Sequence, residues 1–340
     1  GLVISNLGAC ALFAAMSGSS PATCAAIGKM GIPEMRKRGY PDGVAAGSIA
    51  AGGTLGILIP PSVTMIVYGI ATETSIGRLF LAGVFPGLML VGLFMAWSLY
   101  STWRSGDTGL LSTRRYAWRE RFEILPRVLP FLAIILGVLY AMYGGVATPS
   151  ETAAVGALMC LMIAMVIYKL WNPRDLWVVL RDSTKESVMI LFIIAGSITF
   201  SQVLAFSGAT DGLLQVVRDI DPSPLMLLGL MVLVLLFLGM FMDQVSMAMI
   251  TIPFFLPMAE FAGIDLIWLG VLMLVIMEVS FTTPPFGLLL FVMKGVAPPG
   301  ITLRQVYAAA MPFIMLEAAV LALLFLFPEL ALFLPGLIRN

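Results

Sequence analysis

The sequence contains no histidine, and its three cysteines, Cys10, Cys24 and Cys160, lie far apart. A His/Cys zinc or haem site is therefore excluded, and no disulfide framework is expected. We expect each cysteine to pack as a small apolar residue. Charged residues are also scarce, at 11% of 340 residues, whereas a soluble domain carries roughly 25%. So few charges cannot cover the surface of a water-soluble protein.

The residues that are abundant are apolar. Hydrophobic residues make up 60% of the chain, and the mean hydropathy is +1.02. The 19 basic and 19 acidic residues balance, so no strongly basic face is expected for nucleic-acid binding. We predict an all-α polytopic membrane protein that lies in a lipid bilayer. The chain starts with Gly1 and has no signal-peptide pattern, and we expect a fragment.

Long apolar stretches supply the membrane-spanning candidates. They lie at 79–103, 126–143, 150–169, 188–206, 223–241 and 303–327. Several reach the ~20 residues that cross a bilayer as a helix. The segments 44–72 and 266–294 are also long enough, but Gly, Ser, Thr and a Pro-Pro pair interrupt each of them. We predict that these two segments are broken helices.

The distribution of Lys and Arg indicates the topology. Most of them lie at 29–38, 104–127, 169–185 and 294–304. An excess of basic residues in short loops marks the cytoplasmic side. With these loops on the cytoplasmic side, segment 223–262 must leave and return on the opposite side. Segment 1–33 ends on the cytoplasmic side. Both segments are therefore predicted to be re-entrant hairpins. The stretches 104–125 and 172–187 are predicted to be interfacial amphipathic segments.

Two blocks of the sequence resemble each other. Each has an apolar arm, a polar tip, a second arm, a broken helix and a final helix. The distance from Ser19 to Pro60 is 41 residues, and so is the distance from Asp243 to Pro284. The blocks have opposite sidedness, which is typical of a transporter with its binding site at the repeat interface. The alternative is that Pro and Gly kinks coincide by chance. The repeat also predicts that about a hundred residues precede Gly1.

The candidate site follows from where the backbone must be irregular. Such backbone is tolerated at membrane depth only where it lines a cavity or is buried in protein. The candidates are Ser17, Gly18, Ser19 and Ser20 (first tip), Gly53, Thr54 and Gly56 (first break), Met242, Asp243 and Gln244 (second tip), and Ser280, Thr282 and Thr283 (second break). The helix breaks are marked by Pro60, Pro61, Pro284 and Pro285.

The chemistry of these positions favours Na⁺. Neutral oxygens with at most one carboxylate suit Na⁺, whereas Mg²⁺ and Ca²⁺ draw on more carboxylates. The expected Na⁺ ligands are Ser17, Ser19, Gly56, Asp243 and Thr282. No other cofactor is expected. Half-helix N-termini after each tip would favour a substrate carboxylate.

Each candidate has a structural alternative. Ser and Thr in a membrane helix often bond to the backbone or to a neighbouring helix. Asp243 is the strongest candidate, because a carboxylate near the bilayer centre costs roughly 3 kcal/mol. Glu278 could face either a cavity or a helix partner. For Glu317, inside the last long helix, we favour a structural pair.

At these motifs the chain resembles the large membrane subunit of TRAP (tripartite ATP-independent periplasmic) transporters. The resemblance extends over essentially the whole chain. Its most specific parts are LFAAMSGSSPATCAAIGKMGIPEMRKRGY (12–40), GILIPPSVTMIVYG (56–69), SIGRLFLAGVFPG (75–87), TPSETAAVGAL (148–158), LGMFMD (238–243) and TPPFGLLLFV (283–292). Pro21 after the first tip and Gln244 after Asp243 depart from the family pattern, which leaves the substrate class open.

The resemblance implies an elevator-type, Na⁺-coupled importer of carboxylate-bearing organic anions in the bacterial inner membrane. Its implied partners are a small four-helix membrane subunit and a periplasmic substrate-binding protein. Residues 1–103 would form the first-repeat part of the transport domain, with hairpin 1–33, broken helix 44–72 and helix 79–103. Residues 104–222 would form the linker, scaffold helices and amphipathic arm. Residues 223–340 would form the second-repeat part, with hairpin 223–262, broken helix 266–294 and helix 303–327.

Other functions are weaker alternatives. A stand-alone Na⁺/carboxylate symporter of related architecture would need no binding protein. A channel would need a continuous polar pore, but the sequence predicts two dead-end hairpins. A membrane enzyme lacks a credible catalytic set, because the chain has no histidine and no paired intramembrane Asp.

Overall fold

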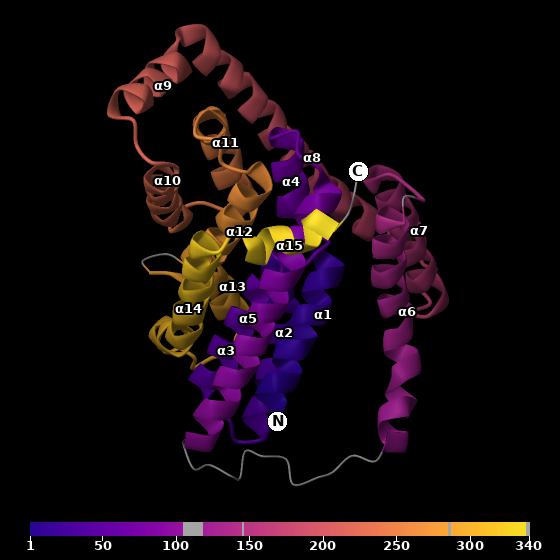
Figure 1. The fold of residues 1–340 in the computed structure, drawn as a ribbon. Coiled ribbons are helices and arrows are strands. Elements are labelled where there is room, and N and C mark those ends of the chain that lie inside the picture. The colour runs from indigo at the N-terminus through magenta and orange to yellow at the C-terminus, as the bar shows by residue number, and fades with distance from the viewer. Residues whose placement is uncertain (105–117, 145, 285–286, 338–340) are drawn as a thin grey trace. The chain divides into compact units, whose positions relative to one another are not determined.

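The computed structural model describes residues 1–340 except 105–117, 145, 285–286 and 338–340, and for 118–125 and 127 it describes the backbone alone. All the regular structure in the described residues is helical (Figure 1). The helices are α1 (Leu2–Ser17), α2 (Ser20–Lys37), α3 (Asp42–Thr54), α4 (Val63–Ala71), α5 (Ile76–Arg104), α6 (Trp118–Tyr143), α7 (Pro149–Val166), α8 (Pro173–Ser207), α9 (Ala209–Ile220), α10 (Pro224–Gly239), α11 (Gln244–Phe261), α12 (Leu266–Thr282), α13 (Leu288–Val296), α14 (Leu303–Leu326) and α15 (Glu329–Leu337).

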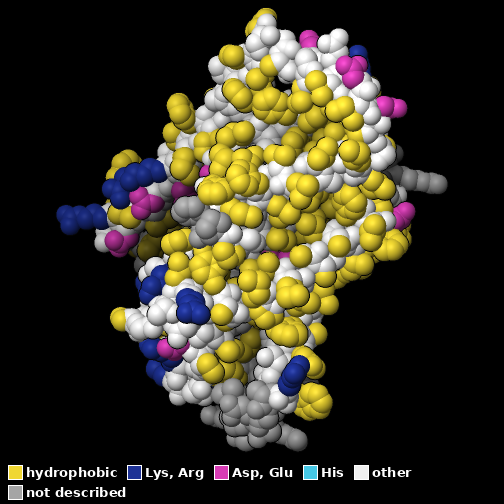
Figure 2. Space-filling view, turned by 90° about the vertical axis from the view of Figure 1, so that its left-hand side faces the viewer, with side chains coloured by type: hydrophobic (Ala, Val, Ile, Leu, Met, Phe, Trp, Pro, Cys, Tyr) yellow, Lys and Arg dark blue, Asp and Glu magenta, His cyan; other side chains and the backbone are white. Residues whose placement is uncertain are grey.

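Several of the described helices have the length and composition of membrane spans. Five of them, α5, α7, α8, α11 and α14, are long and apolar enough to cross a bilayer. On α8 even large aromatic side chains are exposed, with Phe192 at 78% and Phe206 at 92%. Hydrophobic side chains cover most of the face in Figure 2, and the charged side chains gather towards its margins. A surface of this kind is stable in lipid, and the protein is a multi-pass membrane protein.

The predicted amphipathic stretch 172–187 and the predicted span 188–206 are continuous in the structure. That 172–187 lies at the membrane interface stays a prediction. The structure contains a single helix there, α8, from Pro173 to Ser207. After Pro173 in the first helical position, no proline or glycine occurs until Gly196. The backbone therefore has no reason to leave the helix between the polar and the apolar parts.

The chain forms two compact units. One consists of Gly1–Leu111 together with Gly196–Asn340, and the other of Ser112–Ala195. In the second unit α6 packs on α7, which begins with a capping box between Thr148 and Glu151. In the first unit the two ends of the sequence interleave, because α3 packs on α14, α2 on α13 and α4 on α11. The candidate residues of both repeats all lie in this first unit.

The first unit contains the two predicted helical hairpins and the two predicted broken helices. α1 and α2 pack against each other around a tip at residues 18–19, and α10 and α11 around a tip at 240–243. Residues 55–62 separate α3 from α4, and residues 283–287 separate α12 from α13. Whether the hairpins re-enter the membrane from one side stays a prediction.

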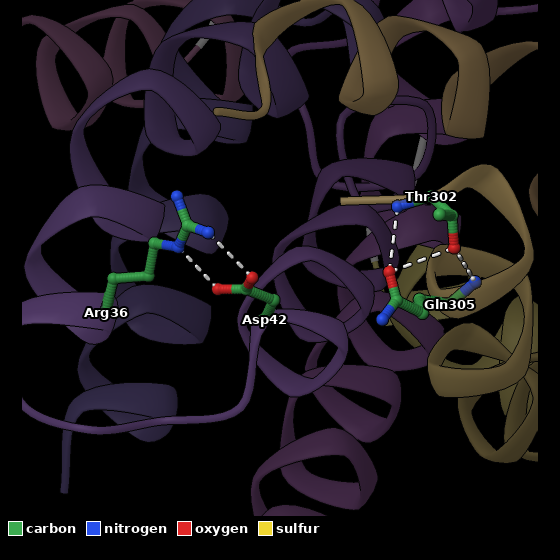
Figure 3. Close-up of polar contacts among 4 residues, drawn as sticks. All are labelled: Arg36, Asp42, Thr302 and Gln305. Atoms are coloured by element: carbon green, nitrogen blue, oxygen red, sulfur yellow. Dashed lines mark hydrogen bonds and ion pairs between the residues drawn. The ribbon is translucent and has the colours of Figure 1, made fainter. Parts of the chain in front are cut away.

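Short polar contacts fix the helix ends that border these elements (Figure 3). Arg36, near the end of α2, pairs bidentately with Asp42, in the first turn of α3, through Nε–Oδ1 at 2.6 Å and Nη2–Oδ2 at 2.9 Å. Thr302 caps α14, and Gln305 returns its side-chain oxygen to the Thr302 N–H at 2.8 Å, which completes a capping box. The Arg36–Asp42 pair lies where the first hairpin joins the first broken helix, and the capping box lies where the second broken helix joins α14.

Candidate binding site at the hairpin tips

The first tip is built by a left-handed glycine and a serine cap. α1 ends at Ser17, and Gly18 follows with φ 60°, its N–H donating to the Ala14 carbonyl at 2.8 Å. Ser19 is extended and caps α2 by accepting from the Ala22 N–H at 3.5 Å. A Cβ on Gly18 would lie 2.7 Å from the Pro61 carbonyl oxygen. The tip therefore lies directly against the first broken helix.

Several contacts join this tip to the first break. The Ser20 hydroxyl donates to the Thr54 carbonyl at 2.7 Å, and the Val63 N–H donates to the Gly18 carbonyl at 3.3 Å. A Cβ on Gly56 would lie 2.6 Å from both the Ser19 carbonyl carbon and the Ser20 nitrogen. The predicted residues of the first tip and the first break thus lie together.

The oxygens of the first tip form a small neutral cluster. The hydroxyls of Ser17 and Thr23 lie 3.1 Å apart, and the Thr23 hydroxyl donates to the Ser19 carbonyl at 2.8 Å. Sequence reasoning missed Thr23. Its position, four residues after Ser19 on α2, places both on one helix face and could have revealed it. Neutral hydroxyl and carbonyl oxygens are ligands that Na⁺ accepts, so the residues fit the predicted ion.

The second tip uses a carboxylate where the first uses a hydroxyl. Asp243 is half-buried and caps α11, with Oδ1 accepting from the N–H groups of Val245 at 3.0 Å and Ser246 at 3.1 Å. Next to it, the side-chain oxygen of Gln244 is buried and has no hydrogen-bond partner in the described structure. Met242 is half-buried, and its N–H donates to the Leu238 carbonyl at 3.1 Å. This tip therefore offers polar oxygens around the start of α11.

The hydroxyls of the second break mostly bond to their own helix. Ser280 donates to the Met277 carbonyl at 3.2 Å, and Thr283 donates to the Val279 carbonyl at 2.5 Å. This is the structural alternative for hydroxyls in membrane helices. α10 approaches the break closely, because a Cβ on Gly239 would overlap the Ser280 side chain. The second hairpin thus contacts the second broken helix through the end of its first arm.

Both breaks begin later than the sequence predicted. Gly53 and Thr54 still belong to α3, and Ser280 and Thr282 still belong to α12. At the first break, the Gly53 and Thr54 carbonyls accept the N–H groups of Gly56 at 3.3 Å and of residue 57 at 3.1 Å. Such tight turns commonly satisfy the end of a helix. Each of these carbonyls therefore accepts a backbone hydrogen bond, and its role as an ion ligand stays a prediction.

The proline pairs lie in or beside the irregular segments. Pro60 and Pro61 fall between α3 and α4 and are joined by a cis peptide bond. Pro284 follows α12 and is exposed. Pro285 lies outside the described residues.

Glu317 of α14 connects the two breaks. It is fully buried. Its Oε1 lies 2.8 Å from the Thr54 hydroxyl and its Oε2 3.4 Å from the Thr282 hydroxyl. Sequence reasoning expected a structural pair for Glu317, and the structure places it between candidate residues of both repeats. No sequence signal could have shown this, because Glu317 and Thr54 are 263 positions apart.

Residues 1–330 match the family described as the tripartite ATP-independent periplasmic transporter, DctM component. The chain belongs to the DctM family. The C4-dicarboxylate TRAP transporter large permease of Pseudomonas aeruginosa is 40% identical over 338 residues, which cover 99% of this chain and 78% of that protein.

Other relatives of this DctM-family chain carry different substrate names. The sialic acid TRAP transporter large permease of Vibrio cholerae is 32% identical, covering 98% of this chain and 77% of that protein. The ectoine permease of Halomonas elongata is 31% identical, covering 99% and 78%. All three relatives are named as transporter permeases, so the family has a transport role in which the substrate varies.

Proposed function

We propose that this permease is the translocating subunit of a Na⁺-coupled, binding-protein-dependent secondary transporter. It imports a carboxylate-bearing organic anion, such as a C4-dicarboxylate, a keto or hydroxy acid or a sugar acid. The 40% identity to a permease named for C4-dicarboxylates supports this substrate class. The observation that carries the proposal is the seating of the first hairpin tip on the first break, through Ser20 and Gly18.

The substrate carboxylate would bind at helix N-termini. α2 begins after Ser19, α4 after Ser62 and α11 after Asp243, all at the tips and breaks. The N–H groups at a helix start carry partial positive charge that favours an anion. At α11 the Asp243 carboxylate already accepts from two of these groups. The negative charge of Asp243 would repel a second anion there, so the starts of α2 and α4, which neutral serines cap, offer the better positions for a substrate anion.

Two Na⁺ sites would lie beside the substrate, related by the internal pseudo-symmetry. The first would use the 17–20 tip and the 53–56 break, where the hydroxyl cluster of Ser17 and Thr23 supports ion binding. The second would use the 242–244 tip and the 280–283 break, where Asp243 supplies the one carboxylate. Na⁺ contributes charge compensation at these oxygens when it is bound.

The two repeats would form a transport domain that moves as a unit, and the helices of 104–222 would form a scaffold. The partners would be a small four-helix membrane subunit and a periplasmic substrate-binding protein, in the bacterial inner membrane. Substrate held between a tip and a break is released to either side only if the unit slides or a hairpin opens. Sliding a bare Asp243 through hydrocarbon is costly, so Na⁺ and substrate together would permit the inward step.

Uptake into proteoliposomes tests the transport proposal. The complex, reconstituted with its small subunit and binding protein, should accumulate labelled organic anion only with an inward Na⁺ gradient. Equal uptake without Na⁺ would overturn the coupling. Equal uptake without the binding protein would favour the stand-alone symporter.

Cross-linking tests the elevator motion. Phe200 of α8 and Phe254 of α11 lie with ring centroids 6.1 Å apart, and the Ser197 hydroxyl donates to the Met249 carbonyl at 2.5 Å. A cysteine at 200 should cross-link to one at 254 with a short reagent. If this cross-link forms without Na⁺ and substrate, then adding both should shift it to positions several residues away along α11. If it forms with both ligands, then removing them should cause the shift. One register under all conditions would contradict the elevator mechanism.

A further inference from the structure

One face of α8 borders a hollow in the second compact unit. The hollow has a volume of about 540 Å³, and the described residues that line it run from Trp177 to Phe192. They recur every three or four positions along α8, which places them on a single face of the helix. All of them are exposed, so a molecule from the surrounding membrane can reach this face.

The charges on this face of α8 are all positive. Arg181 and Lys185 line the hollow, whereas the acidic residues Asp182 and Glu186 do not. Each acidic residue directly follows a basic one, and the turn of about 100° between neighbouring helical residues carries it off the face. The face therefore presents two cations, Arg181 and Lys185, which are called the basic pair below.

A single carboxylate contacts the basic pair and does not neutralise it. Arg181 Nε lies 3.2 Å and Lys185 Nζ 3.6 Å from the same atom, Oδ1 of Asp182. In the described residues neither cation forms another ion pair. The two cations are 49% and 67% exposed, and ion pairs as exposed as these are weak. The basic pair therefore keeps a net positive charge and hydrogens that it can donate to an anion.

Beyond the basic pair the face is apolar. Val188, Met189 and Phe192 line the rest of the hollow. No charged residue occurs in α8 from Ser187 to its end at Ser207, and this uncharged part is long enough to cross the hydrocarbon core of a bilayer. The basic pair lies just before this part, at the level that the lipid headgroups occupy when α8 spans the membrane.

An occupant that matches the whole face carries an anion at one end and an apolar chain at the other. Lys185 and Phe192 are seven residues apart, or roughly 10 Å along a helix. A phospholipid places its phosphate and its acyl chain in this order. Thr184 lies beside the basic pair and donates its hydrogen to the Leu180 carbonyl at 2.7 Å. Its oxygen can therefore only accept a further hydrogen bond, which a headgroup hydroxyl supplies.

We propose that this face of α8 binds an anionic phospholipid with a hydroxyl-bearing headgroup, of the phosphatidylglycerol class. Arg181 and Lys185 bind the phosphate, which accepts strong hydrogen bonds from charged donors. Thr184 accepts from the glycerol headgroup, and an acyl chain lies along the apolar part of the face. A zwitterionic lipid binds more weakly, because its ammonium group is repelled by the net positive charge of the basic pair.

A protein partner matches this face less well than a lipid. The partner would have to place acidic side chains against the basic pair at headgroup level, where lipid phosphates are already abundant. The apolar part of the face is also suited to lipid, since Phe192 is 78% exposed. The proposed lipid site depends neither on Na⁺ nor on the transported substrate.

Photolabelling of the full transporter complex in phosphatidylcholine nanodiscs tests this site. A phosphatidylglycerol with a photoreactive diazirine in its acyl chain should label residues 188–192, as mapped by mass spectrometry of peptides. Unlabelled phosphatidylglycerol should compete roughly five- to thirtyfold better than phosphatidylcholine with the same acyl chains. This range corresponds to one or two effective positive charges near the membrane surface.

The variants test the role of the basic pair. The double variant Arg181→Gln with Lys185→Gln should be labelled less and should lose the preference for phosphatidylglycerol. The matched control Arg174→Gln removes a basic side chain that is exposed on the same helix but does not line the hollow. It should keep both the labelling and the preference.

Three results would overturn the proposal. The first is equal competition by the two lipids in the wild-type complex, which would show general lipid contact only. The second is an unchanged preference in the double variant. The third is no labelling of residues 188–192; a photoreactive amino acid at position 189 that cross-links to the small subunit would then identify a protein as the occupant. The wild-type comparison decides the question even if the double variant does not fold. Because no uptake is measured, failure here leaves the proposed transport function intact.

Discussion

The two hairpin tips occupy corresponding positions in the repeats but use different chemistry. Ser19 caps α2 with a weak contact of 3.5 Å to the Ala22 N–H. Asp243 caps α11 with two contacts, of 3.0 and 3.1 Å. The first tip is also bonded to its break through Ser20, whereas the second half meets its break through Gly239 and Ser280. The first tip is held against its break by contacts between neutral groups, whereas the second tip carries the negative charge of Asp243.

This difference suggests that the two repeats have different roles in binding. A neutral tip that packs tightly against its break can hold a substrate or ion with little electrostatic change on release. A carboxylate tip is stable in a membrane mainly when a cation or a donor compensates it. The second tip is therefore the half at which ion binding should matter most.

The largest expected effect comes from Asp243→Asn. Asparagine caps helices about as well as aspartate, so α11 should keep its start while the negative charge is lost. We expect Na⁺-driven uptake to fall by at least tenfold and the melting temperature to change little. Uptake into proteoliposomes and thermal unfolding of the purified complex measure the two effects.

The control for Asp243 is alanine. Asp243→Ala loses both the charge and the cap, so it should lose uptake and also about 1 kcal/mol of stability. Wild-type uptake by the Asn variant would show that Asp243 is a structural cap and that the two tips are functionally alike.

The packing of the first tip is tested by Gly56→Ala. The new Cβ would lie 2.6 Å from the Ser19 carbonyl carbon, and overpacking of this kind costs roughly 1–3 kcal/mol. Gly92→Ala on α5 is the matched control, because nothing lies within 4 Å of its new Cβ. Thermal unfolding should show the loss for Gly56→Ala alone. Equal melting temperatures for Gly56→Ala and the wild-type protein would mean that the first tip does not pack tightly against its break.

The sequence could predict the hairpins and broken helices because apolar length and the positions of Gly and Pro determine them. The expected stretch 303–327 corresponds closely to α14, Leu303–Leu326. The breaks were placed too early because tight turns extend α3 and α12 beyond the first small residues, such as Gly53 and Ser280. Composition does not report such local hydrogen bonds.

Parts of the site that depend on long-range packing were beyond the sequence. Glu317 contacts Thr54 and Thr282, and only the packing of α14 on α3 and α12 brings these three residues together. The helix α9 was missed for a different reason. It is a short amphipathic segment of 12 residues, and its charges resemble those of a loop.

Ser19→Ala and Thr282→Ala compare ion binding in the two halves. Each removes one neutral oxygen from a proposed Na⁺ site, and we expect the Na⁺ concentration for half-maximal uptake to rise roughly five- to tenfold, corresponding to a contribution of about 1 kcal/mol. Ser223→Ala is the matched control for Ser19, because Ser223 caps α10 with a similar contact, of 3.3 Å to the Met226 N–H, but lies outside the proposed sites. An unchanged Na⁺ dependence in both variants would remove the assignment.

The smallest expected effect concerns the connections from each hairpin to its broken helix. In the first half, Arg36 and Asp42 form an ion pair whose side chains are 38% and 28% exposed, and exposed pairs contribute about 0–1 kcal/mol. In the second half, Asp265 caps α12 through the N–H groups of Ile267 at 2.8 Å and Trp268 at 3.0 Å, and such a cap contributes about 1 kcal/mol. Thermal unfolding should therefore show a smaller loss for Arg36→Gln than for Asp265→Ala. The Arg36→Gln loss should shrink further at high salt, because salt screens exposed charges, while the Asp265→Ala loss should persist. The reverse order would mean that the ion pair at the first connection holds its hairpin more firmly than the cap holds the second.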